Sequence, residues 1–149
     1  MSKIALLLID PQNDFHDGGS LAVPGSLDDA NRIATFIDRK ADEISKIYVT
    51  MDSHHRLHIA HSLFWRKGDI QEIIHPDPFT TISHESIKTG EWIPVDEKLL
   101  NYAINYTKQL EASGKFQLLI WPEHCLIGSP GHNVYEIIQA SIHRWEAKT

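Results

Sequence analysis

The sequence predicts an α/β fold built around a parallel sheet. Residues 4–9 form an unbroken apolar run that ends on a carboxylate, Asp10. Such a run, without polar alternation, is typical of a strand buried on both faces, as in a parallel sheet with helices above and below. A helical segment and a second strand follow, which is the order of a right-handed βαβ unit. At 149 residues, the chain is expected to form one domain, 1–149.

The elements after the first strand follow from their own patterns. Ser26, with Asp29 three positions later, is typical of a helix start, and apolar residues recur at helical spacing over residues 27–43. Residues 46–51 predict a second strand parallel to the first. Periodicity then fails between residues 62 and 94, where prolines and glycines separate the aromatic residues. A loop of that length is usually functional or a lid.

Regular structure is expected again in the last third of the chain. A helix is predicted from Asp96, and Gly114 ends it. Residues 116–121 predict a third strand, which Pro122 terminates. A third helix follows the turn at 128–131, with these residues on one face: Val134, Ile138, Ile142 and Trp145. The sequence stops where a fourth strand is due.

Composition narrows the function classes. Hydrophobic residues make up 42% of the chain, and no apolar run is long enough to span a bilayer, so we expect a soluble, cytoplasmic protein without a membrane partner. The net charge of −6 argues against a nucleic-acid partner, because no basic stripe is available to replace counterions. One cysteine excludes an internal disulfide, and ten histidines favour metal binding.

Asp10 occupies a position with a functional interpretation. In open α/β sheets, ligands bind in the crevice outside the carboxyl ends of the strands, and Asp10 follows such an end. The alternative is an aspartate that only caps the turn into Pro11.

A second group of residues predicts a metal site. Asp52 and His54 are two positions apart after the second strand, so both side chains project to the same side of an extended backbone. If the third strand lies beside the second, His124 reaches the same edge, and His58 is a possible fourth ligand. Oxygen and imidazole donors suit a divalent first-row metal, and three protein ligands are typical of a catalytic zinc site. A lone loop histidine is more often a surface or hydrogen-bonded residue, and we assign that role to these: His16, His55, His61, His75, His84, His132 and His143.

Three separate motifs resemble the isochorismatase-like cysteine hydrolases, and among them the nicotinamidases most closely. The motifs lie at residues 8–15 with 18–25, at 50–54 with 58–59, and at 121–125 with 128–131. They occur in the family's order and extend from one end of the chain to the other.

The resemblance implies a Rossmann-like, three-layer αβα fold whose parallel sheet has the order 3-2-1-4-5-6. It also implies that nicotinamide or a related aromatic amide is hydrolysed to the acid and ammonia through a cysteine thioester, by an Asp, Lys, Cys triad in NAD salvage. Asp10 matches the triad acid. In the family, a zinc-type divalent ion is held by ligands that match Asp52, His54 and His124. Phe15 matches an aromatic residue of the substrate pocket, and Trp65 is either a second one or an ordinary core aromatic.

The chain departs from the family pattern in its catalytic residues. The positions of the catalytic lysine and the nucleophilic cysteine lie beyond the last motif, and neither is present. Cys125 matches the cysteine that follows the metal-ligating histidine, and Lys148 falls within the expected third helix. The chain therefore resembles the amino-terminal half of the enzyme, strands 3-2-1, truncated at its carboxyl terminus.

Three functional hypotheses follow. The first is a nicotinamidase-like hydrolase that is inactive as this chain alone, because the catalytic lysine and cysteine are missing from it. One edge of its first strand would be unpaired, which invites pairing with another chain, so we expect a homo-oligomer or a missing carboxyl-terminal half. The second is an inactive metal- or ligand-binding remnant or half of a split enzyme. The third makes Cys125 a nucleophile beside a metal-bound His124.

Overall fold

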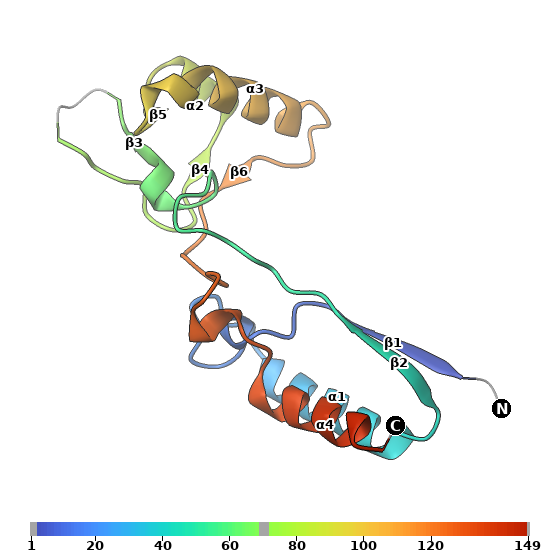
Figure 1. Ribbon diagram of the computed structural model, residues 1–149. Coiled ribbons are helices and arrows are strands. Elements are labelled where there is room, and N and C mark those ends of the chain that lie inside the picture. Colours follow the sequence, from blue (N-terminus) through green and yellow to red (C-terminus); the bar gives the residue numbers. More distant parts are fainter. Residues whose placement is uncertain (1–2, 69–71, 149) are drawn as a thin grey trace. The chain divides into compact units, whose positions relative to one another are not determined.

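The chain folds into two compact units in the computed structural model, which describes residues 3–68 and 72–148 (Figure 1). The first unit comprises the residues up to His54 and those from His124 onward, and the second comprises residues 55–123. The chain thus leaves the first unit after His54 and returns to it at His124.

The first unit contains the predicted βαβ arrangement. Strand β1 (Ile4–Leu8) pairs in parallel with β2 (Ile44–Val49), and helix α1 (Ser26–Lys40) connects them. Helix α4 (Glu136–Glu146) packs against α1, as Figure 1 shows. One core cluster joins the sheet to both helices, and its buried members are Leu8, Ala30, Ile37, Ile138 and Ile142. The predicted parallel strands and both helices are therefore confirmed.

The expectation that the first strand is buried on both faces is wrong. Burial alternates along β1, and the side chains of Leu7 and Ile9 are 56% and 71% exposed. The reason is that Leu6 and Leu8 face the α1 and α4 cluster, so that with a period of two the intervening side chains point away from it. Within the described residues, β1 pairs with β2 alone.

The two helices of the first unit are joined by a charged contact as well as by their core. Arg144 of α4 donates two hydrogen bonds to the carboxylate of Asp38 on α1, at 3.0 and 2.7 Å. The hydrogen bond from Arg144 lowers the pKa of Asp38 below its usual value. Trp145 adds a hydrogen bond from its indole Nε1 to the carbonyl of Ile44, at 3.2 Å, which fixes α4 against the start of β2.

The second unit has its own hydrophobic core. Strand β3 (Trp65–Lys67) pairs antiparallel with β5 (Trp92–Pro94), and helices α2 (His84–Lys88) and α3 (Leu100–Glu111) pack against each other. The aperiodic segment thus forms short elements, because its aromatic residues are buried in this core. The buried members include Phe64, Trp65, Ile82, Trp92 and Ile120.

The third predicted strand pairs differently from the expectation. Strand β6 (Leu118–Leu119) is antiparallel to β4 (Thr81–Ile82) in the second unit, rather than parallel to β2. Two backbone hydrogen bonds extend this pairing: the Ile120 amide donates to the Thr80 carbonyl, and the Phe79 amide donates to the Ile120 carbonyl. Leu118 and Ile120 bury their side chains in the second core. A three-stranded 3-2-1 sheet is therefore not formed within residues 3–68 and 72–148; the fold is mixed α/β, with parallel and antiparallel sheets.

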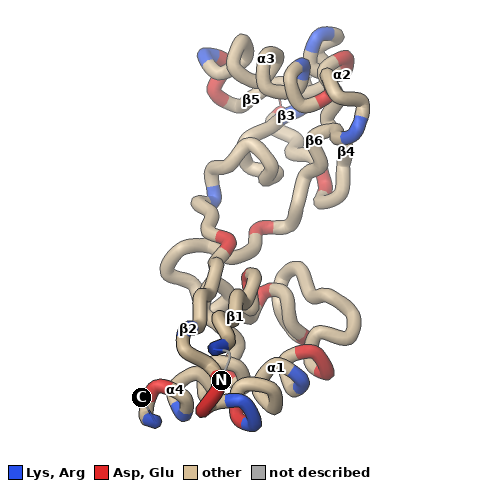
Figure 2. Tube along the Cα trace, turned by 90° about the vertical axis from the view of Figure 1, so that its right-hand side faces the viewer, with Lys and Arg blue, Asp and Glu red and all other residues tan. Residues whose placement is uncertain are grey.

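Figure 2 shows acidic and basic residues interspersed along the helices of both units rather than gathered on one basic face. None of the helices in the described part of the chain is long and apolar enough to cross a lipid bilayer.

Candidate metal centre and adjoining cavity

Two chain segments of the first unit bring the three predicted ligands together. His54 lies beyond the end of β2, and it forms an isolated parallel bridge with Leu126. The His54 amide donates to the carbonyl of Cys125, and the Ile127 amide donates to the carbonyl of His54, both at 3.0 Å. The bridge places the returning segment beside the outgoing one, so that His124 lies next to Asp52 although β6 does not pair with β2.

Asp52 is the centre of the ligand cluster. Its Oδ1 lies 2.9 Å from Nε2 of His54, and its Oδ2 lies 3.1 Å from Nε2 of His124. One possible ligand atom from each of these three side chains lies within 4.8 Å of the others. His124 is buried and the other two are half-buried. One carboxylate and two imidazoles that converge in this way fit a zinc-type divalent ion.

Gln12 holds the Asp52 backbone in place. The Gln12 side chain is fully buried and lies beyond β1. Its Oε1 accepts from the Asp52 amide at 2.7 Å, and its Nε2 donates to the carbonyls of Asp52 at 2.7 Å and His132 at 2.9 Å. The side chain therefore takes the place of a strand partner for the ligand-bearing segment, a role that the sequence analysis missed.

Asp14 supports the other ligand-bearing segment. Its Oδ2 accepts from the backbone amide of Cys125 at 2.6 Å, and its Oδ1 accepts from the Ser20 amide at 3.2 Å. Cys125 has a φ of 47°, in the left-handed region, so this bond holds a strained residue that directly follows His124. Gly131 lies against the same carboxylate, and a Cβ there would collide with it. Asp14 was also missed, and its spacing of two from Gln12 in the first motif is the signal that could have identified it.

Asp10 lies at the carboxyl edge of the same sheet. Its amide donates to the carbonyl of Thr50 at 3.2 Å, and the Thr50 hydroxyl donates to its Oδ1 at 2.6 Å. A cavity of about 620 Å³ is lined by Asp10, Phe15 and residues of α1. The Phe15 ring also meets the His124 ring edge-on, at a centroid distance of 5.7 Å. Phe15 therefore contacts both the cavity and the ligand cluster.

The two remaining candidates belong to the second unit. Trp65 is fully buried in the second core, and its Nε1 donates to the carbonyl of Ile59 at 2.6 Å, which supports the alternative of a core aromatic. His58 belongs to the second unit, where its Nδ1 accepts from the Ala60 amide at 3.1 Å. Its role as a fourth ligand stays a prediction.

Cys125 is poorly suited to be a nucleophile. Its side chain is fully buried, and burial raises the pKa of the thiol to about 12, with further contributions from Asp52, Asp14 and Asp10. The reactive form of a cysteine is the thiolate, which this environment suppresses.

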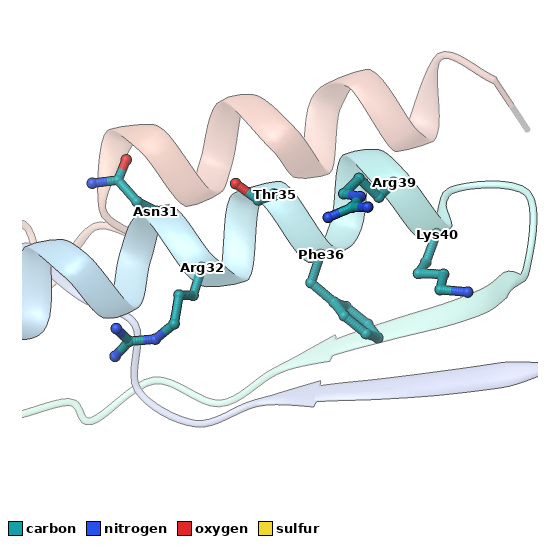
Figure 3. Close-up of a pocket in the computed structure, with 6 residues that line it drawn as sticks. All are labelled: Asn31, Arg32, Thr35, Phe36, Arg39 and Lys40. Atoms are coloured by element: carbon teal, nitrogen blue, oxygen red, sulfur yellow. The ribbon is translucent and has the colours of Figure 1, made fainter.

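A second hollow is lined by residues of α1 alone. Figure 3 shows its six lining side chains, which include Arg32, Phe36 and Arg39. It contains no member of the ligand cluster.

Comparison with solved structures identifies the fold. The yeast nicotinamidase, determined alone and bound to the inhibitor nicotinaldehyde, matches with a TM-score of 0.58 in both structures, over 95% of this chain, at 21% sequence identity. The chain shares the fold of the yeast nicotinamidase over the part that it spans. It spans about half the length of the yeast enzyme, 53% of that chain.

A nicotinamidase and pyrazinamidase from Acinetobacter matches with a TM-score of 0.49 and 22% identity, over 90% of this chain and 45% of that one. No family model and no curated protein matches the sequence.

Proposed function

We propose that this chain carries the metal-binding edge and the proton-accepting acid of a nicotinamidase-like amidohydrolase. The substrate is nicotinamide or a related aromatic amide, and the products are the acid and ammonia. The observation that carries the proposal is the Asp52 carboxylate between the His54 and His124 imidazoles, at the sheet edge that also holds Asp10. The fold shared with the yeast enzyme supports it.

The residues present have distinct roles in this proposal. Asp52, His54 and His124 hold a divalent ion of the zinc type, which would bind and orient the aromatic ring of the substrate. Asp10 accepts the proton of the attacking thiol, and the hydrogen bond from Thr50 to its Oδ1 fixes the carboxylate for this purpose. Phe15, which borders the cavity beside Asp10, packs against the substrate ring.

The thioester mechanism needs a lysine and a cysteine that match no position of this chain. Cys125 is its only cysteine, and its thiol is buried. We therefore propose that these 149 residues alone are inactive, and that a further polypeptide segment or subunit supplies the missing groups. Homo-oligomerisation, a cytoplasmic location and a role in NAD salvage stay predictions.

Two measurements on the purified chain test the proposal. Isothermal titration with Zn²⁺ should show one site, and D52A and H124A should each weaken it by about 100-fold or more. Ammonia release from nicotinamide should be absent for the chain alone and should appear when a polypeptide carrying the catalytic lysine and cysteine is added.

The outcomes separate the hypotheses. Absence of zinc binding would refute the metal centre, and hydrolysis by the chain alone would refute its inactivity. A stable monomer that binds zinc but gains no activity from any added segment would favour the binding remnant.

A further inference from the structure

We propose that the ion pair between Arg56 and Glu123 is a positioning device for the metal centre, and this inference rests on the proposed metal site. The Arg56 Nε–H is shared between the two carboxylate oxygens of Glu123, at 2.8 and 3.1 Å.

The position of the pair in the chain gives it this role. Arg56 follows the ligand His54 by two residues, and Glu123 directly precedes the ligand His124. Their Cα atoms are therefore within about 7 Å and about 4 Å of those of the two ligands, whatever the conformation between them. The contact joins residues 67 positions apart in sequence, at the two places where the chain passes between its compact units.

The same two segments are also joined by backbone hydrogen bonds at His54 and just after His124. There, backbone hydrogen bonds link His54 to Cys125 and Ile127. His54 thus makes the backbone bridge itself, and the ion pair follows two residues later in the sequence. Two attachments restrict the separation of His54 and His124 more than one does, which reduces the ordering that metal binding must impose.

If the ion pair acted only through its charges, the expected effect of removing Arg56 on Zn²⁺ affinity would be the opposite of that expected for positioning. If only charge mattered, removal of the Arg56 cation would strengthen binding of a dication, and removal of the Glu123 anion would weaken it. Under positioning, removal of either partner weakens binding. Arg56 therefore decides between the two explanations.

The experiment measures Zn²⁺ affinity by competition with a chelating dye, for the full chain and four variants. We expect R56A and E123A each to weaken binding about fivefold, and the double variant R56A/E123A to be no weaker than the weaker single variant. The charge-swapped chain R56E/E123R should recover to within about twofold of the wild type. Circular dichroism confirms that each variant is folded.

The pair between Arg144 and Asp38 provides the matched control. It is also an arginine–carboxylate contact with two hydrogen bonds, at 3.0 and 2.7 Å, and it joins α4 to α1 rather than the ligand-bearing segments. R144A and D38A should leave Zn²⁺ affinity unchanged. Unchanged or tighter binding in R56A, or the same loss in R144A, would overturn the positioning role while leaving the metal centre intact. A wild-type chain that binds no Zn²⁺ would overturn both.

Discussion

Replacing Gln12 with methionine removes the side-chain hydrogen bonds that hold the Asp52 segment while keeping a side chain of similar length. Three bonds are lost, one from the Asp52 amide and two to the carbonyls of Asp52 and His132. Each leaves a partly buried backbone group without its partner, at a cost of about 1 kcal/mol. We therefore expect the first unit to lose about 3 kcal/mol of stability, and its Tm to fall by about 12–24 °C.

Hydrogen exchange of the Asp52 amide, followed by NMR, tests this prediction at the group concerned. The amide donates to Gln12 Oε1, so its exchange should accelerate by about two orders of magnitude in Q12M. Asn13→Ala is the control, because Asn13 donates one exposed side-chain bond, to Pro130, and should cost less than about 1 kcal/mol. Equal losses in the two variants, or an unchanged Asp52 amide, would show that Gln12 does not brace the ligand segment.

Three other substitutions or treatments have defined outcomes. Asp38→Asn should destabilise the chain at pH 7, where Arg144 pairs with the ionised carboxylate. The loss of stability should shrink as the pH falls below 3.8, the ordinary pKa of an aspartate, and through the lowered pKa of Asp38 in the folded chain. Urea unfolding at pH 7 and pH 3 measures this loss. Cys125 should react with iodoacetamide at pH 8 about a thousandfold more slowly than after denaturation, because its side chain is fully buried, and fast labelling of the native chain would contradict this. Gly131→Ala should destabilise the first unit by about 2 kcal/mol or more, since the new methyl group meets the Asp14 carboxylate; an unchanged melting curve would count against that contact.

Local patterns predicted the local elements of this fold well. The apolar run after Lys3, the helical spacing after Ser26 and the second strand correspond to β1, α1 and β2, because each of these patterns is contained within its own segment. Pairing between distant segments was predicted poorly. Residues 116–121 read as a strand in isolation, but nothing within them indicates that the partner is Thr81–Ile82 rather than β2. That choice depends on the second core, whose aromatic residues lie in a segment without periodicity.

The same division between local and distant information applies to the candidate site. Asp52, His54 and His124 were predicted from donor type and position, and their side chains do converge. Gln12 and Asp14 were missed because their role is to satisfy backbone groups of other segments, which carry no side-chain signature in the sequence. Both are buried polar side chains. The partners of Gln12 lie at least 40 residues away in the sequence, and Cys125, a partner of Asp14, lies 111 residues away. Buried polar groups must be hydrogen-bonded. A polar residue that follows a strand end within a recognised motif therefore predicts a side chain that hydrogen-bonds to the backbone of another segment. In the first motif, Asp10, Gln12 and Asp14 stand at every second position. Asp10 and Gln12 accept hydrogen bonds from residues that follow β2, and Asp14 accepts one from the segment that carries His124.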